Sequence, residues 1–379
     1  MRGHIRKHRQ NSWAIVVELP RGPDGKRRQQ WTIVKGDRPE AERKLTAILN
    51  QLDKGGYQKP VRLTVAEYLR QWLKDYAEVN VRPRTYARYA EICEKRIIPA
   101  LGTIKLTDLK PAQVQSFYSQ ALTKVKAITV YYYHRVLCEA LRYGVRHEMI
   151  MRNVCEAVDA PKPKPRQLVT TGREGIGRLL EAVRNTKYYT LFYSAAYTGM
   201  RRSELLGLKW RNVDLDFATL YITETLQKLG KNNYVFWEPK SQRGKRSIDL
   251  PPSLAILLSE HKAQQQAFRK SKGLPSTEDD LVFCHPDGSP YNPGDVSRTF
   301  HQVAQSIGLD GLRFHDLRHA HASLMLQQGI PVKVISERLG HSSTAFTMDK
   351  YAHVLPGMQE QAAQKFDELM LPTTAGAKK

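Results

Sequence analysis

Hydrophobic and polar residues alternate in two short runs near the beginning of the chain. The runs Ser12–Glu18 and Gln30–Val34 are rich in β-branched and aromatic residues, and a Pro-Asp-Gly turn sequence lies between them. This pattern predicts two strands that pair as a hairpin. Residues 39–52 then place leucine and isoleucine on one side of a helix. We therefore expect a small sheet with one helix behind it.

The hydrophobic period changes to that of amphipathic helices after residue 60. Thr64 precedes residues 65–77, in which the apolar positions share one face, so we expect a helix capped by Thr64. A second helical stretch follows from residue 82, Pro111 is placed to open a third helix, and residues 129–148 form the fourth. Residues 61–160 are therefore predicted to be a four-helix domain.

Two segments have the composition of linkers. Residues 161–166 alternate proline with cations, which excludes a helix or a central strand and favours an extended connection. Residues 55–60 contain two glycines and a proline and resemble a loop. The predicted division is an N-terminal domain at 1–57, a helical domain at 62–160, a third domain at 168–370 and a disordered tail at 371–379.

The third predicted domain contains both hydrophobic periods, so we expect an α+β fold. A basic hairpin loop is expected between the last two of its three strands. The expected strands are Thr219–Thr225, Asn233–Glu238 and Arg246–Leu250, and the expected helices are Tyr188–Ala196, Leu254–Lys270, Val296–Ile307, Ala320–Gln328, Val332–Leu339 and one capped by Ser342 or Ser343 that ends at Tyr351. The predicted fold class is thus multidomain and mainly α, with small β-sheets.

Charge narrows the range of partners. The 379 residues include 60 Lys and Arg against 37 Asp and Glu, a formal charge of +23, which indicates a polyanionic partner and most simply nucleic acid. The four cysteines are far apart, so neither a zinc site nor a disulfide framework is expected. The chain has no signal-peptide pattern and no run of about 18 apolar residues, so we expect a soluble, intracellular protein without a membrane partner.

Chemically capable side chains gather between residues 312 and 355. His315 and Arg318 have the i, i+3 spacing of one helix face, His341 follows a Leu-Gly pair, and Tyr351 comes ten residues later. Guanidinium groups bind phosphate oxygens bidentately, imidazoles transfer protons, and a phenol can attack phosphorus. Taken singly, each of these residues is more often surface or packing, so it is their combination that indicates phosphodiester chemistry.

A second arginine stands at a predicted helix start. Gly199 is expected to end one helix and Arg201 to begin the next, where free backbone N–H groups favour an anion. Glu204 lies one turn further on the same face and could orient an arginine or a histidine. A simple surface pair with Arg201 is the alternative.

These motifs resemble the signature of the tyrosine recombinases, the phage integrase family. The matching pieces are TGMRRSELLGLKW at 198–210, HDLRH at 315–319, LGHSS at 339–343 and the tyrosine of MDKYAH. The resemblance also implies a catalytic lysine in the basic loop 239–245, which is assigned to Lys240 with Lys245 or Arg243 as rivals. The implied catalytic set is Arg201, Lys240, His315, Arg318, His341 and the nucleophile Tyr351, with Glu204 in support.

The resemblance implies a role for each of these residues. Tyr351 would attack the scissile phosphate and form a 3′-phosphotyrosyl link, while Arg201 and Arg318 neutralise the non-bridging oxygens. Lys240 would protonate the leaving 5′-oxygen. His315 would take the tyrosine proton or hold the phosphate, and His341 would donate to a phosphate oxygen. No cofactor and no metal are expected, and His319, His321 and His353 do not match catalytic places, so His319 and His321 are interpreted as packing or surface groups.

The implied partner is double-stranded DNA at core and arm sites. By resemblance the first domain is an arm-type DNA-binding domain and the second the core-binding, SAM-like helical domain. A homotetramer on DNA is implied, together with an excisionase and a DNA-bending protein as candidate accessory factors, and a tail helix at 356–369 would dock on a neighbouring protomer. The candidate DNA contacts are Arg82, Arg84, Thr85, Arg88, Arg202, Arg243 and Lys245.

The extra N-terminal domain favours one member of the family over the others. It indicates an integrase of a prophage or an integrative and conjugative element, which would act in the bacterial cytoplasm and on the nucleoid when bound. The alternatives are an Xer-like resolvase of chromosome or plasmid dimers, a type IB topoisomerase-like relaxing enzyme, and a DNA-binding regulator whose catalytic domain is idle.

Overall fold

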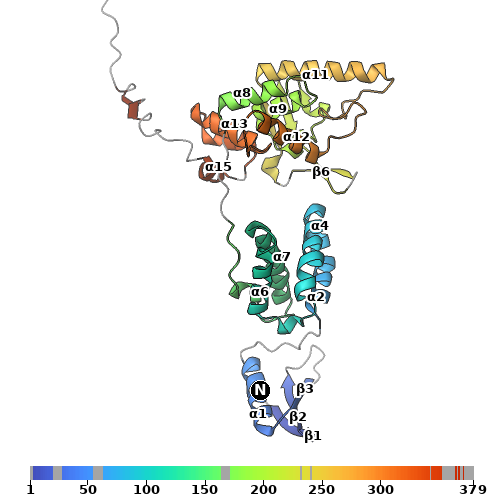
Figure 1. The fold of residues 1–379 in the computed structure, drawn as a ribbon, viewed down its shortest axis with the longest axis vertical. Coiled ribbons are helices and arrows are strands. Elements are labelled where there is room, and N and C mark those ends of the chain that lie inside the picture. The colour runs from blue at the N-terminus through green and yellow to red at the C-terminus, as the bar shows by residue number, and fades with distance from the viewer. Residues whose placement is uncertain are drawn as a thin grey trace, which may run out of the picture. The chain divides into compact units, whose positions relative to one another are not determined.

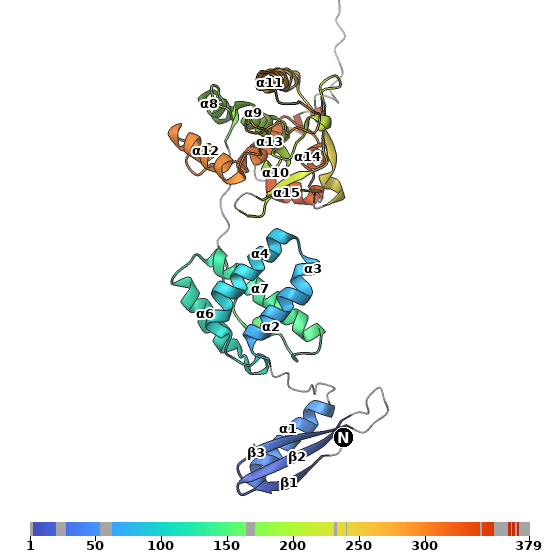
Figure 2. The same cartoon turned by 90° about the vertical axis from the view of Figure 1, so that its right-hand side faces the viewer.

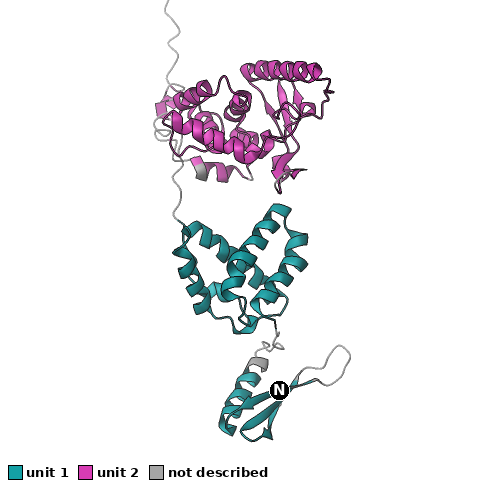
Figure 3. Cartoon of the chain, turned by 45° about the vertical axis from the view of Figure 1, so that its right-hand side comes forward, with its two compact units in different colours: residues 1–165 teal, residues 166–379 magenta. Residues whose placement is uncertain are grey.

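The protein divides between Pro165 and Arg166 into two compact units (Figure 3). The structure is a computed structural model, and each unit is described by itself. The described residues are 3–19, 28–53, 63–163, 171–230, 233–239, 241–341, 343–351, 363–364, 366–367 and 370. The predicted class, mainly helical with small sheets, is confirmed (Figure 1). No helix within these ranges is long and apolar enough to cross a membrane.

The first unit begins with an antiparallel three-stranded sheet in the order β1-β2-β3 (Figure 2). The strands are β1 (Gly3–Arg9), β2 (Ser12–Leu19) and β3 (Arg28–Lys35), and helix α1 (Arg38–Asp53) follows. The predicted pairing of β2 with β3 is confirmed, although most of the expected turn lies outside the described residues. Strand β1 was not predicted, because its basic sequence does not alternate with apolar residues, as is common for an edge strand.

The two faces of this sheet differ in character. Alternate residues of the strands pack against Ala41 and Leu45 of α1 and form a small core with Ile15 and Val17. On the opposite face His4, Arg6, Trp31 and Ile33 of the two outer strands are exposed, on either side of the buried Ala14 and Val16 of β2.

Helices with a common aromatic and aliphatic core make up the rest of the first unit. Thr64 forms the predicted capping box with Glu67, each side chain bonding the backbone N–H of the other. The elements are α2 (Val65–Trp72), a π-helical turn (Leu73–Ala77), α3 (Glu78–Asn80), α4 (Pro83–Ile92), a second π-helical turn (Cys93–Ile97), α5 (Ile98–Leu101), α6 (Pro111–Leu122) and α7 (Ala127–Arg146), with 3₁₀ turns at Leu106–Asp108 and Val154–Ala157.

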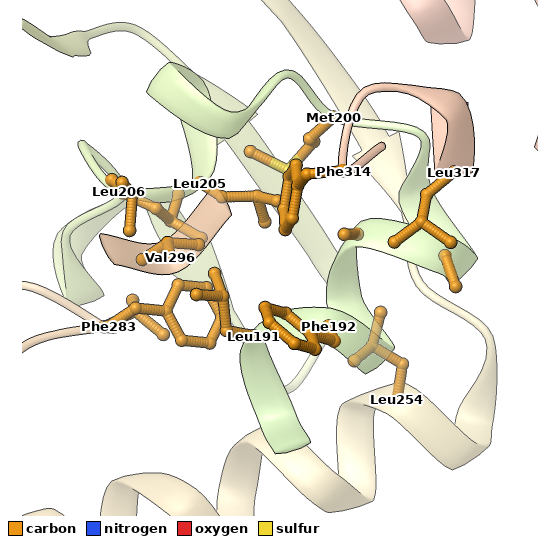
Figure 4. Close-up of a cluster of buried hydrophobic side chains, with 14 of the residues drawn as sticks. Leu191, Phe192, Met200, Leu205, Leu206, Leu254, Phe283, Val296, Phe314 and Leu317 are labelled. Carbon is orange, nitrogen blue, oxygen red and sulfur yellow. The ribbon is translucent and has the colours of Figure 1, made fainter. Parts of the chain in front are cut away.

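The second unit packs its helices around one large core, part of which Figure 4 shows. Phe192 of α9 contacts Phe300 and Phe314 edge to face at its centre. The helices are α8 (Arg173–Ala182), α9 (Tyr189–Thr198), α10 (Arg202–Leu205), α11 (Pro252–Ser271), α12 (Pro293–Ser306), α13 (Asp316–Gln327), α14 (Val332–Leu339) and α15 (Thr344–Tyr351). The four cysteines of the chain are free thiols.

The strands of this unit differ from the prediction. The single strand expected at Thr219–Thr225 is two strands, which belong to different sheets. The two polar residues between these strands bind side chains outside the sheets: Thr223 accepts a hydrogen bond from Asn212, and Glu224 forms an ion pair with Arg211. The sheets are β4-β5-β8 and β6-β7, with β4 (Val213–Asp214), β5 (Thr219–Ile222), β6 (Thr225–Lys228), β7 (Tyr234–Trp237) and β8 (Arg246–Asp249).

The predicted basic hairpin loop is therefore a connection between two sheets. Strand β7 pairs with β6, and β8 pairs with β5, so residues 238–245 do not close a hairpin. A short 3₁₀ turn lies at Gln242–Gly244 within this connection. The position predicted for the catalytic lysine, Lys240, lies outside the described residues.

Candidate active site

Two glycines in the left-handed conformation end two helices beside the candidate site. Gly199 ends α9 with φ +65°, and Gly340 ends α14 with φ +64°. Neither has room for a side chain, since a Cβ on Gly199 would lie 2.6 Å from Leu339 Cδ2, and one on Gly340 would lie 2.8 Å from the Arg243 carbonyl oxygen. At both positions glycine is needed for two reasons: it adopts the positive φ without strain, and it leaves room for the neighbouring atoms.

Glu204 is buried and holds two arginines. Its carboxylate accepts from Nη1 of Arg201 at 2.6 Å and from Nη2 of Arg246 at 2.9 Å. Burial alone would raise the pKa of Glu204, but the Arg246 and Arg201 guanidiniums hold it below its ordinary value. The surface-pair alternative for Glu204 is therefore wrong, and the sequence did not reveal Arg246 as its second partner.

Arg201 and Arg246 also bind the backbone of the neighbouring helix end. Arg201 donates to the Gly340 carbonyl oxygen at 3.1 Å, and Arg246 donates to the Arg338 carbonyl oxygen at 2.6 Å. The Arg246 side chain is 7% exposed, whereas that of Arg201 is 38% exposed. Arg201 can therefore meet an anion from solvent, while Arg246 is placed to support the cluster.

Arg318 lies in α13 and is almost completely buried. Its guanidinium donates to the carbonyl oxygens of Gly199, at 2.9 Å, and of Leu339. Burial, with the positive charge of Arg201, lowers the pKa of Arg318 to about 9, so it stays charged at neutral pH. The cluster thus contains three guanidiniums and one carboxylate, an excess of positive charge that a bound phosphate would compensate.

His341 follows Gly340 and is buried. Its Nδ1 is 2.8 Å from the hydroxyl oxygen of Thr347 in α15. Burial and the nearby charges of Arg318 and Arg201 lower the pKa of His341 to about 3, so the ring is neutral. A neutral ring can still donate one N–H, which is the hydrogen bond expected of it toward a phosphate oxygen.

Tyr351 ends α15 with its side chain buried against Leu326, Ile335 and Leu339. Its hydroxyl is 2.7 Å from Nδ1 of His319, one helical residue after Arg318. Burial raises the pKa of Tyr351 to about 12, although the charge of Arg318 opposes the shift. Ser343 accepts a hydrogen bond from the Phe346 N–H, so the predicted cap of this helix is confirmed.

His319 is the residue that sequence reasoning set aside. It is buried, contrary to the surface interpretation, and it is the hydrogen-bond partner of the proposed nucleophile. His315 stands at the N-cap of α13, is exposed, and packs its ring edge to face on His319 with centroids 5.1 Å apart. The four-residue spacing of the two histidines was the available signal, but the family motif directed attention to His315.

His321 belongs to the support of the site. Its Nδ1 is 3.0 Å from the Ala196 carbonyl oxygen and its Nε2 accepts from Arg338. Burial, with the charge of Arg338, lowers the pKa of His321 to about 4. The packing interpretation is therefore the one that the structure supports.

The candidate DNA contacts lie in several places. In the first unit Arg84 and Arg88 are exposed on α4, Arg82 is its N-cap, and Thr85 is in its first turn. Arg88 forms an ion pair with Glu91 at 2.8 Å. In the second unit Arg202 bonds Ser297 of α12, Arg243 is exposed, and Lys245 forms an exposed ion pair with Glu238.

None of the described residues forms a group of three or more His, Cys, Asp or Glu arranged to hold a metal ion. His353 and most of the tail helix predicted at 356–369 lie outside the described residues.

Comparisons with known proteins place the chain in a family. Residues 172–358 match the phage integrase family, and residues 64–122 match the N-terminal SAM-like domain of phage integrases. A protein named tyrosine recombinase XerC-like from Caldanaerobacter subterraneus subsp. tengcongensis is 25% identical over 96% of this chain and 98% of its own length. An integrase from Streptomyces ambofaciens is 26% identical over 89% of this chain and 88% of its own.

Solved structures share the fold. The Tn1549 transposon integrase in complex with a circular intermediate DNA superposes with a TM-score of 0.68 at 17% identity, over 81% of this chain and 99% of that one. The lambda integrase tetramer bound to a Holliday junction gives a TM-score of 0.59 at 19% identity, over 90% of this chain and 92% of that one.

The fold and the matches define a DNA strand-exchange enzyme of the integrase type, which carries out site-specific recombination. The chain belongs to the phage integrase family, the tyrosine recombinases.

Replacing Glu204 by glutamine should lower the free energy of unfolding by about 3–5 kcal/mol, because two guanidiniums would lose their buried counter-charge. Denaturant unfolding of the full chain measures this. Glu181→Gln, which breaks an exposed pair with Arg184, is the matched control and should cost less than about 1 kcal/mol. Equal losses in the two variants would show that the buried cluster does not depend on Glu204.

Acid should destabilise the second unit through its buried neutral histidines. The pKa of His321 is about 4 and that of His341 about 3 in the folded protein, against an ordinary value of about 6.5 in the unfolded chain. Below about pH 6.5 the unfolded state therefore binds more protons than the folded state. The free energy of unfolding is highest above that pH and falls as the pH is lowered toward the folded-state pKa values. Each histidine should contribute a slope of about 1.4 kcal/mol per pH unit.

Denaturant unfolding at pH 7, 6 and 5 measures these slopes. His341→Asn keeps a polar partner for Thr347 but cannot be protonated, so it should remove about one histidine's share of the slope. His301→Asn, at an exposed position on α12, should leave the slope as in the wild type. A slope that His341→Asn does not change would rule out the assigned neutral state.

Proposed function

We propose that Tyr351 is the nucleophile of this recombinase and that Arg201, Arg318 and His341 bind the scissile phosphate. The tyrosine oxygen attacks phosphorus, the bond to the 5′-oxygen breaks, and a 3′-phosphotyrosyl link forms. Lys240 is the general acid that protonates the leaving 5′-oxygen, and His315 lies at the edge of the site to hold the phosphate. The link conserves the energy of the phosphodiester, so religation needs no nucleotide cofactor.

One observation carries the proposal. The Glu204 carboxylate binds the Arg201 and Arg246 guanidiniums, and the Arg318 guanidinium lies near enough to feel the charge of Glu204. The Tyr351 hydroxyl in turn lies close enough to Arg318 for that charge to affect its pKa. Positive charge placed in a region of low water content stabilises the charge that develops on phosphate oxygens during attack. In this proposal the arginines supply the charge that a metal ion supplies in many nucleases.

We propose that the residues predicted from the sequence to contact DNA do so. Arg82, Arg84, Thr85 and Arg88 at the start of α4 would bind the core site, since arginines and a helix N-terminus suit phosphates. Arg202, Arg243 and Lys245 would bind the backbone near the cleavage point. The open sheet face with Arg6 and Trp31 would bind the arm site, because β-strands can enter a groove.

The N-terminal sheet favours an integrase of a prophage or of an integrative and conjugative element, which integrates and excises that element. The chain would act as a tetramer on DNA, with an excisionase and a DNA-bending protein as accessory partners, in the bacterial cytoplasm and on the nucleoid. The tetrameric lambda integrase on a Holliday junction supports the assembly by similarity of fold. An Xer-like resolvase is the alternative, which the similarity to a XerC-like protein favours.

Tyr351→Phe should abolish covalent chemistry and leave DNA affinity within about twofold of the wild type. The assay mixes the full chain with DNA from the ends of its element, in EDTA and without ATP, and detects a protein–DNA adduct on a denaturing gel. Tyr221→Phe, at an exposed tyrosine, is the control and should form the adduct normally. An adduct in Tyr351→Phe would show that the nucleophile is another residue.

The same assay separates the other candidate classes. Tight specific binding by the wild type without any adduct would favour the regulator, and relaxation of a plasmid that lacks the site would favour a topoisomerase-like enzyme.

Arg6→Ala and Trp31→Ala should each weaken binding to arm-site DNA, because their side chains stand on the open face with the Arg6 guanidinium 6.0 Å from the Trp31 ring centroid. Fluorescence anisotropy at several salt concentrations measures the affinity. Arg6→Ala should lower the slope of log affinity against log salt concentration by about one, as expected for the loss of one phosphate contact. Arg43→Ala, at an exposed position on α1, is the control. Unchanged affinity in both variants would exclude this face as the arm-binding surface.

A further inference from the structure

Tyr351, the proposed nucleophile, is hydrogen-bonded to His319, a histidine outside the family's catalytic set. The Tyr351 hydroxyl and Nδ1 of His319 are 2.7 Å apart, with ring centroids 5.7 Å apart. Tyr351 is 1% exposed and His319 is 9% exposed, so bulk water has little access to this contact. A general base must lie within about 3.2 Å of the proton that it removes, and this pair meets that condition.

The surroundings of the pair favour proton transfer over simple packing. The tyrosine ring lies among Leu326, Ile335 and Leu339, which offer no hydrogen-bonding groups on their side chains. A buried phenol resists ionisation, and attack on phosphorus therefore needs an acceptor for its proton in the same dry space. His319 follows Arg318 directly in α13, so the acceptor and the phosphate-binding guanidinium are fixed on one rigid element.

We propose that Nδ1 of His319 accepts the Tyr351 proton during attack on the scissile phosphate. The inference rests on the proposed role of Tyr351 as the nucleophile. As the bond between the tyrosine oxygen and phosphorus forms, the phenolic proton moves to Nδ1, and the bond between phosphorus and the 5′-oxygen breaks. The 5′-oxygen takes its proton from Lys240. His319 starts with its other nitrogen, Nε2, protonated and becomes an imidazolium, which returns the proton to the tyrosine on religation.

This assignment divides the work of the two neighbouring histidines. His315 is exposed at the N-cap of α13, where DNA can reach it, and it contacts the His319 ring edge to face. His315 is therefore left to hold the phosphate, the second of the two roles that its motif allows. The charged and titratable groups near the pair include His315 beside His319, Arg318, whose charge acts on Tyr351, and His341, whose pKa the charge of His319 lowers.

The test measures single-turnover adduct formation on DNA from the element's ends with the full chain. His319→Asn is the main variant, because its side-chain oxygen can accept the tyrosine's hydrogen bond at the position of Nδ1 but cannot take the proton. We expect its cleavage rate to fall by about 10²–10⁴-fold while DNA affinity and thermal unfolding stay as in the wild type. His319→Ala should be at least as slow, and His301→Asn is the matched control.

The pH dependence of the cleavage rate separates proton transfer from packing, because a loss of packing alone would not change the shape of that dependence. The rate of His319→Asn should rise about tenfold per pH unit above pH 8, as the free phenolate replaces the missing base, while the wild-type rate stays nearly level.

Each other outcome overturns a different statement. A wild-type rate in His319→Asn would reduce His319 to a hydrogen-bond partner of Tyr351. Faster cleavage in His319→Ala would make the contact an inhibitory one that holds the tyrosine back. An adduct in Tyr351→Phe would overturn the proposed nucleophile itself, and the inference with it, which distinguishes the two failures.

Discussion

The buried carboxylate of Glu204 is the contact on which the second unit's site depends. It holds the Arg201 and Arg246 guanidiniums, and these in turn bind the carbonyl oxygens at the end of α14. Arg318 binds the ends of both α9 and α14. Cations that would repel one another are thus held by one anion and several backbone dipoles. In the proposed function the remaining positive charge is already in place for a phosphate before DNA binds, which would limit the reorganisation that accompanies the reaction.

The same burial governs the proton chemistry around that charge. Excluding water raises the pKa of Tyr351 to about 12 and lowers that of His341 to about 3, because each shift favours the neutral form. In the proposed reaction a buried, neutral phenol needs an acceptor for its proton before it can attack phosphorus. Nδ1 of His319, 2.7 Å from the Tyr351 hydroxyl, is the acceptor that we propose. The same packing of helix ends therefore positions the positively charged arginines and keeps the Tyr351 hydroxyl neutral.

Local rules accounted for most of the elements. Capping, glycine and proline signals placed the helix at Thr64 and the ends of α14 and α15, because such signals act within one turn of the backbone. They failed where distant residues decide the outcome. The strand expected at 219–225 divides since Thr223 and Glu224 are bound by Asn212 and Arg211, and strand β1 forms although its own sequence is basic, because β2 supplies its partner.

The sequence by itself determined the family, the helical class and the candidate residues Arg201, Arg318, His341 and Tyr351, since spacing and residue type along the chain are enough to show a motif. Only the tertiary structure decided what each of them touches. Arg246 was hidden because its partner Glu204 is 42 residues away, and His319 because the tyrosine that it binds is 32 residues away. Contacts across such separations depend on how the helices pack, and residue spacing within one helix does not determine which distant side chain it will meet.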